Sequence, residues 1–142
     1  MNEVPDAPAG PLAGLLVADF SRVLAGPFST QILGDLGADV VKVEAPVGDE
    51  TRGWRPPERD GVSTYYLGIN RNKRDLVLDF RDDEDRRLAQ ELARRADIVI
   101  ENFKPGGLAK YGLDYDTVAA ANPRVVYASI SGFGPHGGAS LP

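Results

Sequence analysis

Apolar residues along the chain gather in five short runs, and apolar positions recur every three or four residues in the stretches between them. Short apolar runs bounded by glycine, proline or charged residues are typical of buried strands, whereas the wider spacing is typical of amphipathic helices. The pattern predicts strands over residues 15–20, 39–44, 75–80, 96–101 and 125–130. It predicts helices over residues 26–36, 82–95 and 117–121.

The first predicted helix begins at Gly26 and Pro27, because proline has no N–H to leave unpaired in a first helical turn. One side of this helix carries apolar residues that we expect to be buried: Phe28, Ile32, Leu33 and Leu36. Gly37 is expected to end it in the left-handed conformation. In the next helix, Asp82 or Asp83 is expected to form the cap. Apolar positions repeat there every four residues: Leu88, Leu92 and Ala96.

Strands that alternate with helices predict an α/β fold, an open parallel sheet with helices on both faces. Residues 1–11 are expected to form a flexible tail and residues 12–142 a single domain. Residues 48–57 are too polar and proline-rich for a core element and predict a long excursion, in which Trp54 serves as a packing anchor. Residues 63–68 fit either a short helix or a strand. The sequence stops in a loop just after a strand, which predicts a piece of a larger protein.

Composition and charge exclude several classes of functional site. The chain has 142 residues, no cysteine, one histidine and a formal net charge of −5. Thiolate chemistry and cysteine metal sites are therefore excluded, and nucleic-acid binding gains no support from the charge. No acidic run has metal-loop spacing, and no apolar run is long enough to cross a bilayer. We expect a cytoplasmic protein without a metal or a membrane or nucleic-acid partner, in which His136 is exposed to solvent.

Three loops leave the carboxyl ends of predicted strands, the place where open α/β sheets bind ligands: residues 21–27, 102–107 and 131–138. Lys104, Lys110 and the cationic segment 70–74 are candidate phosphate sites, although such cations can equally serve only to balance surface charge. Glu44 ends the second strand where an NAD-binding fold would place a ribose ligand. The first loop, however, has one glycine in place of G-x-G-x-x-G, which leaves an NAD-linked oxidoreductase as a weak alternative.

Six segments together carry a family resemblance. They are Leu24-Ala25-Gly26-Pro27, residues 34–44 (GDLGADVVKVE), residues 48–52 (GDETR), residues 70–74 (NRNKR), residues 101–106 (ENFKPG) and residues 129–134 (SISGFG). In this order and spacing, the chain resembles the amino-terminal portion of the family III CoA-transferases, the group of the formyl-CoA and carnitine CoA-transferases. The resemblance covers nearly all of the chain from Pro11 onward. Each motif alone is weak, and their order makes the match specific.

The resemblance implies a Rossmann-like domain that takes coenzyme A or an acyl-CoA as substrate, with no permanently bound cofactor. It implies a binding site built from residues on four segments: Arg22, Val23, Leu24, Ala25, Leu78, Arg81, Asn102, Phe103, Lys104 and Lys110. Leu78 and Arg81 would lie near the adenine, and Asn102 to Lys110 near the nucleotide and its phosphates. Formyl-CoA transferase has an arginine at the position of Ala45, so one cationic contact differs.

The family moves CoA between carboxylic acids through an aspartyl mixed anhydride and an enzyme–CoA thioester. The resemblance places that aspartate beyond Pro142, so no catalytic residue is expected in this chain, and the chain alone is expected to be inactive. Full-length members form interlocked homodimers. The α-methylacyl-CoA racemases share the fold and stay an alternative, although residues 24–27, 42–44, 70–73 and 101–103 favour the transferases. A non-catalytic CoA-binding module is a further alternative.

Overall fold

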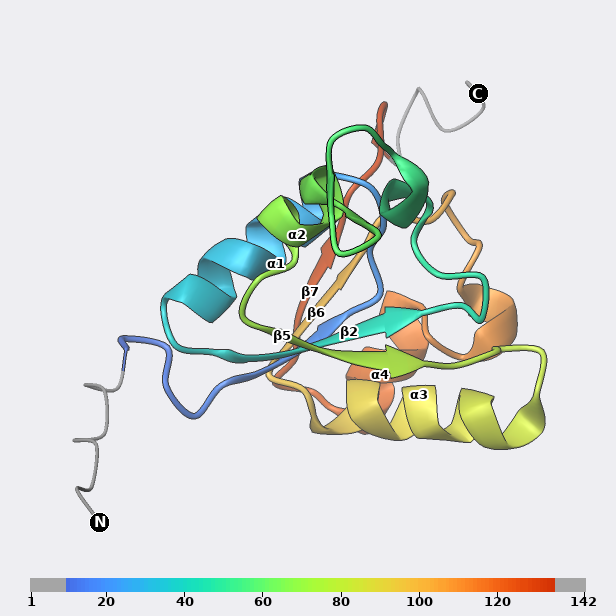
Figure 1. Cartoon of the computed structure of the whole chain (residues 1–142). Helices are drawn as coiled ribbons and strands as arrows, with labels where there is room; N and C mark the ends of the chain where they lie inside the picture. Colours follow the sequence, from blue (N-terminus) through green and yellow to red (C-terminus); the bar gives the residue numbers. More distant parts are fainter. Residues whose placement is uncertain (1–9, 135–142) are drawn as a thin grey trace, which may run out of the picture.

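The computed structural model describes residues 10–134, arranged as a five-stranded parallel sheet between two layers of helices (Figure 1). The sheet contains β1 (Leu16–Asp19), β2 (Asp39–Glu44), β5 (Lys73–Val77), β6 (Ile98–Glu101) and β7 (Val126–Ser129). The helices are α1 (Ala25–Asp35), α2 (Thr64–Ile69), α3 (Asp83–Arg95) and α4 (Tyr115–Ala121), with the short 3-10 helices η1 (Glu50–Gly53) and η2 (Ala109–Tyr111). A small antiparallel pair, β3 (Glu58–Arg59) and β4 (Val62–Ser63), precedes α2.

The strand order β5-β2-β1-β6-β7 confirms the predicted α/β class. Taken in sequence, the five parallel strands stand in the order third, second, first, fourth and fifth, as in doubly wound nucleotide-binding sheets. Figure 1 shows α1 and α2 on one face of the sheet and α3 and α4 on the other. The order of the strands reverses at β1, because β2 and β5 lie on one side of it and β6 and β7 on the other. The crevice at the carboxyl ends of β1 and β6 is therefore the expected ligand position.

Most of the apolar core lies between the sheet and the layer of α3 and α4. It is formed by buried residues of both: Ala18, Phe20, Val43, Leu78, Ala89, Ala93, Ala96, Val99, Leu108, Leu113 and Val118. The opposite face, under α1, has a smaller apolar cluster of Val17, Ala38 and Val40. The face under α1 therefore has room for polar groups.

The prediction of a buried apolar face on α1 is wrong. Phe28, Ile32 and Leu36 are 50 %, 44 % and 41 % exposed, and only Leu33 packs on the small cluster. The buried residues of α1 are instead Gly26, Pro27, Thr30 and Gln31. The reason is the buried Asp19 carboxylate beneath α1, which accepts a hydrogen bond from Thr30 Oγ1 at 2.6 Å. A leucine at that place would leave a buried carboxylate oxygen with one donor fewer.

The remaining elements agree with the sequence within a few residues. Asp82 caps α3 by accepting hydrogen bonds from the N–H groups of Glu84 and Asp85, but Leu88 is half exposed because Ala89 and Ala93 face the core. Strand β5 runs over Lys73–Val77, two to three residues earlier than predicted, because it pairs with β2 and ends where β2 ends. Residues 64–69 form α2, which resolves the ambiguity there. Gly37 has the expected positive φ, +101°.

The excursion, residues 48–57, is more buried than its sequence predicts. Asp49 and Thr51 are buried, at 3 % and 0 % exposure, and make hydrogen bonds within the core. Trp54 packs on Tyr65, with ring centroids 5.0 Å apart. The tail up to residue 9 and the loop that contains His136 lie outside the described residues.

Candidate functional site

Strand alternation gives the face of the sheet under α1 its charged residues. Successive side chains of a strand point to opposite faces, so the apolar partners of the α3 layer alternate with residues that face α1. Near the carboxyl ends of β1 and β2, and along β5, those residues are charged: Asp19, Lys42, Glu44, Lys73 and Asp75. These charges lie side by side in the sheet, and each needs a partner of opposite charge.

Two buried ion pairs supply partners for three of them, Asp19, Lys73 and Lys42. Lys73 Nζ lies 3.1 Å from Asp19 Oδ2, and Lys42 Nζ lies 3.0 Å from Asp49 Oδ2. The four side chains are at most 2 % exposed. A buried charge without a partner is strongly unfavourable, so each pair holds its two segments at a fixed separation. The first pair joins β1 to β5, and the second joins β2 to the excursion.

Glu44 is fully engaged by its own neighbours. Its Oε2 accepts hydrogen bonds from Arg52 Nε at 2.7 Å and from the Asp49 N–H at 2.9 Å. Its Oε1 accepts from the Tyr66 hydroxyl at 2.6 Å and from Arg52 at 3.1 Å. A carboxylate has about four acceptor positions, and here four donors occupy them. Glu44 is therefore committed to the fold rather than free to bind ribose hydroxyls, which removes the feature that suggested an NAD site.

The same contacts set the pKa values of this cluster. Burial raises the pKa of Glu44, but hydrogen bonds from Arg52 and Tyr66 outweigh it, and the net pKa is lowered. Burial also opposes ionisation of Asp49, and hydrogen bonds from Thr51 together with the Lys42 charge lower its pKa. Burial, and then the nearby Glu44 charge, raise the pKa of Asp75. The effect of Asp75 on stability in acid is therefore opposite to that of Glu44 and Asp49.

We expect the chain to lose stability in mild acid. Groups with a lowered folded pKa stabilise the fold above their unfolded pKa, about 4 for carboxyl groups, and this contribution disappears as the pH falls through the folded pKa. The free energy of unfolding should therefore fall progressively below about pH 5. Urea unfolding at pH 7, 5, 4 and 3 measures it, and Glu44→Gln should show a shallower dependence. Equal stability of the wild type at pH 7 and pH 3 would contradict this account.

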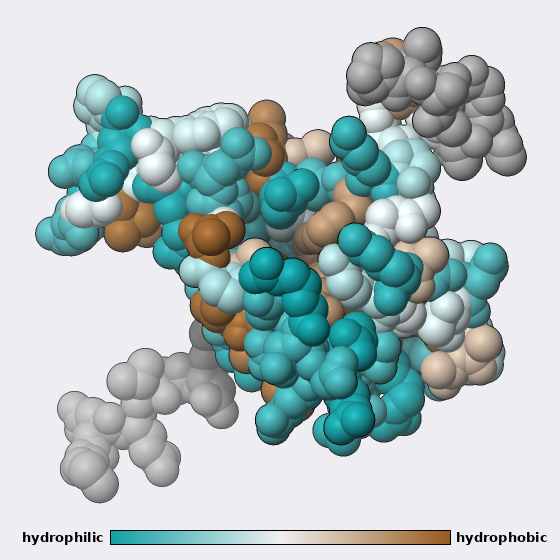
Figure 2. Space-filling model, turned by 90° about the vertical axis from the view of Figure 1, so that its right-hand side faces the viewer, coloured by the Kyte–Doolittle hydropathy of each residue, from teal (hydrophilic) through white to brown (hydrophobic). Residues whose placement is uncertain are grey.

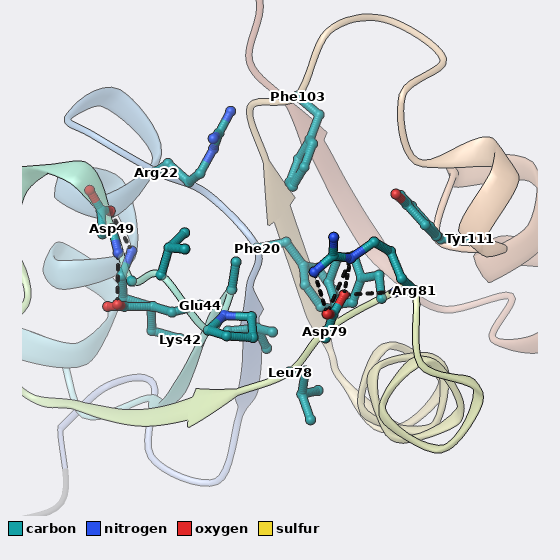
Figure 3. A pocket seen from close by; sticks show the side chains of 16 residues that line it. Phe20, Arg22, Lys42, Glu44, Asp49, Leu78, Asp79, Arg81, Phe103 and Tyr111 are labelled. Carbon is teal, nitrogen blue, oxygen red and sulfur yellow. Dashed lines mark hydrogen bonds and ion pairs between the residues drawn. The ribbon is translucent and has the colours of Figure 1, made fainter.

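A pocket of about 290 Å³ opens beside this network at the carboxyl ends of the strands (Figure 3). Its lining is mainly apolar with a few charged groups: Phe20, Arg22, Lys42, Val43, Glu44, Ala45, Pro46, Val47, Gly48, Asp49, Leu78, Asp79, Phe80, Arg81, Phe103 and Tyr111. Figure 2 looks onto the side on which β2 and β5 end, and shows hydrophilic residues over most of it with apolar residues between them. An apolar floor with a charged rim suits a ligand that has a flat ring and an anionic chain.

Four of the ten residues expected in the binding site line this pocket: Arg22, Leu78, Arg81 and Phe103. The Arg22 guanidinium lies over the Phe103 ring, 5.2 Å from its centroid, and Figure 3 shows the two side chains together at one rim. Arg81 hydrogen-bonds to Asp79 of the same loop and lowers the pKa of that carboxyl to about 2. Part of the Arg81 charge is thus already compensated.

The other six residues lie around the pocket rather than in its wall. Val23 donates its N–H to Asp49, a lining residue, and Leu24 and Ala25 begin α1. Asn102 holds the backbone of Arg22. Lys110 Nζ lies 4.8 Å from the ring centre of the lining residue Tyr111. Lys104 lines a second cavity, between the ends of β6 and β7.

The cationic segment 70–74 does not form a phosphate site. Arg71 pairs with Asp35, Arg74 pairs with Asp39, and Lys73 is buried against Asp19. Arg22, Lys104 and Lys110, by contrast, form no ion pair within residues 10–134. Of the cations expected in the binding site, Arg22, Lys104 and Lys110 are therefore the ones left to an anionic ligand.

Sequence reasoning missed several lining residues, chiefly Phe20, Lys42, Asp49 and Tyr111. A lysine in an otherwise apolar strand was a usable signal for Lys42, because a buried lysine needs a partner. Tyr111 had no such signal, since only the packing of η2 brings it to the pocket.

Comparison with known proteins decides the family. The profile of CoA-transferase family III matches residues 12–141. The chain belongs to this family. It is 49 % identical to the succinate–glutarate CoA-transferase of Agrobacterium fabrum, over 96 % of this chain and 36 % of that protein. It is 47 % identical to the acetyl-CoA:oxalate CoA-transferase of Acetobacter aceti, over 94 % of this chain and 34 % of that protein.

A solved structure of similar sequence has the same fold. The crystal structure of a CAIB/BAIF family protein from Brucella suis superposes with a TM-score of 0.90 at 51 % identity, over 94 % of this chain and 36 % of that one. The family III chain described here thus spans about a third of the length of its relatives. Within residues 10–134, no helix is long and apolar enough to span a membrane.

Proposed function

We propose that this chain is the CoA-binding part of an acyl-CoA:carboxylate CoA-transferase. The observation that carries the proposal is the pocket at the carboxyl ends of the strands, which has aromatic walls. At its rim lies the Arg22 cation, which forms no ion pair within residues 10–134. CoA has the matching parts, a flat adenine and a chain of phosphates. Family membership and the relatives' names support the same ligand.

The pocket's size suggests which part of CoA it takes. Its volume of about 290 Å³ lies at the lower end of the range for ligand pockets, about 300–1,000 Å³. We therefore assign it to the adenine end, with the ring against Leu78 and the neighbouring aromatic side chains. Arg22, and beyond it Lys104 and Lys110, would meet the phosphates, because a cation without a carboxylate partner gains most from an anion.

We propose ligand binding for this chain and no covalent step. The family resemblance assigns the aspartate nucleophile to the part that follows in the relatives, and we propose that the homodimer and the acid pocket depend on that part too. The names of the two relatives contain different acids, glutarate and oxalate, so we propose no particular acid for this chain. A cytoplasmic location is part of this proposal, and a racemase of the same fold is its main rival.

Calorimetric titration of the purified chain tests the proposal. CoA should bind saturably, and NADH should neither bind comparably nor displace it. Lys110→Ala should weaken CoA binding by about twofold to fivefold, as expected for one charged contact at the surface. Arg124→Ala is the matched control and should leave the affinity unchanged, because Arg124 is an exposed cation that lines neither the pocket nor the second cavity. A folded chain that shows no saturable heat change with CoA at either of two temperatures would refute the proposal.

The same preparation should not transfer CoA between succinyl-CoA and a second acid. The reason is that the expected nucleophile lies beyond Pro142. Chromatography of the reaction with glutarate or oxalate as acceptor measures it, with boiled protein as the background. Formation of a new CoA thioester above that background would show that this chain holds its own nucleophile.

A further inference from the structure

The loop that follows β1 is held by side chains from outside it. At its centre, the Arg22 N–H donates to Asn102 Oδ1 at 2.8 Å, and Asn102 Nδ2 donates to the Arg22 carbonyl oxygen at 2.7 Å. The Asn102 side-chain amide thus hydrogen-bonds to both the N–H and the carbonyl oxygen of Arg22. These two residues lie 80 positions apart in the sequence and meet because β1 and β6 are neighbours in the sheet.

The groups on either side of Arg22 are fixed as well. The Ser21 carbonyl oxygen accepts from Lys42 Nζ at 3.0 Å, and the Val23 N–H donates to Asp49 Oδ2 at 3.2 Å. Val23 has a φ of +69°, in the left-handed region that a β-branched residue rarely enters. Such a conformation persists only where the surroundings impose it. The buried Lys42–Asp49 pair and Asn102 together supply that constraint.

The held backbone determines where the Arg22 side chain goes. Its guanidinium lies over Phe103, the residue directly after Asn102, and forms part of the pocket wall. Asn102 itself does not line the pocket. The turn after β6 therefore fixes Arg22 at two points. The Asn102 amide binds its backbone, and the Phe103 ring contacts its side chain.

We propose that Asn102 is a positioning residue for CoA: it holds the Arg22 backbone so that the guanidinium faces the pocket, and it acts on the ligand through Arg22. The family resemblance implies that Asn102 lies near the nucleotide, whereas the proposed role acts through Arg22. The proposal rests on the proposed CoA site.

A double-mutant cycle tests it. CoA affinity is measured by calorimetry for the wild type, Asn102→Ala, Arg22→Ala and the double variant. Each single variant should weaken binding by about tenfold, the size expected for a hydrogen bond or ion pair to a charged group. The double variant should be no weaker than Arg22→Ala alone, because without the guanidinium nothing is left for Asn102 to position.

Two further readouts separate positioning from other roles. The salt dependence of CoA affinity should be reduced in Asn102→Ala as in Arg22→Ala, because both lose one cation–phosphate contact. The Arg22 amide proton should exchange faster with solvent in free Asn102→Ala than in the free wild type. Asn122→Ala is the matched control, since Asn122 also holds a backbone carbonyl, that of Ala96, and lines no part of the pocket. Its CoA affinity should be unchanged.

Additive losses, an unchanged salt dependence, or an Asn102→Ala variant that binds as the wild type does would overturn the positioning role while leaving the CoA site in place. Absence of CoA binding by the folded wild type would refute the proposed function and this role together. Thermal unfolding of each variant shows whether a loss of affinity accompanies a loss of fold.

Discussion

Replacement of Asp19 by alanine is expected to destabilise the chain by about 3–5 kcal/mol, the usual result of leaving a buried charge without its partner. Asp19 is fully buried and accepts hydrogen bonds from the Lys73 ammonium, the Thr30 hydroxyl and the Ser21 N–H. Natural domains are stable by only about 5–15 kcal/mol, so the variant should lose a large part of its margin. Its Tm should fall by on the order of 10 °C.

The matched control is Asp39→Ala. Asp39 also forms an ion pair with a β5 residue, Arg74, but both side chains are more than half exposed. Exposed pairs contribute about 0–1 kcal/mol, so this variant should unfold almost as the wild type does. Chemical denaturation followed by circular dichroism measures both. Equal effects of the two substitutions would show that burial of the Asp19–Lys73 pair does not matter for the fold.

Replacement of Gly26 by alanine should damage both the fold and the binding loop. A Cβ on Gly26 would lie 2.1 Å from the Cβ of Ser21 and 2.3 Å from its hydroxyl oxygen, closer than atoms can approach. Either α1 or the loop after β1 must move, and forced repacking of this kind usually destabilises by about 1–3 kcal/mol. Because the loop carries Arg22, the affinity for CoA should fall by about tenfold or more.

Gly68→Ala is the control for this substitution. Gly68 lies within α2, and a Cβ there would meet no atom within 4 Å. Alanine favours the helix over glycine, so this variant should be unchanged or stabilised by up to about 1 kcal/mol, with wild-type CoA affinity. Thermal unfolding and calorimetry measure the two properties. A Gly26→Ala chain that binds CoA as tightly as the wild type would exclude this loop from the binding site.

The sequence predicts the sheet of this chain well because apolar runs report burial directly. The run at residues 39–44 becomes β2 with the same bounds, and Asp82 caps α3 as its position before an acidic turn indicates. The same reasoning fails for α1, where Phe28 and Ile32 are exposed. Periodicity indicates which residues share a side of a helix, but it does not indicate that the sheet beneath is polar.

The site is predictable in part for a similar reason. Loops at the carboxyl ends of strands follow from the alternation of elements, which brings Arg22 and Phe103 within the candidate set. The contacts that organise the loops do not follow from local sequence. Asp19 and Lys73 lie 54 positions apart, and Asn102 and Arg22 lie 80 apart, so their meeting depends on strand order and register. The segment 70–74 resembled a free cationic cluster because its partners Asp35 and Asp39 belong to other elements.

The central claim is that the pocket between the ends of β2, β5 and β6 binds CoA, and amide chemical-shift mapping tests it most directly. The 15.2 kDa chain is small enough for a residue-by-residue titration with CoA by NMR. Saturable shifts should concentrate on residues 21–25, 78–81 and 102–104, with little change at Gln90 and Val118, which line a separate cavity between α3 and α4. Shifts centred on that other cavity, or a folded chain with no shifts at millimolar CoA, would contradict the account.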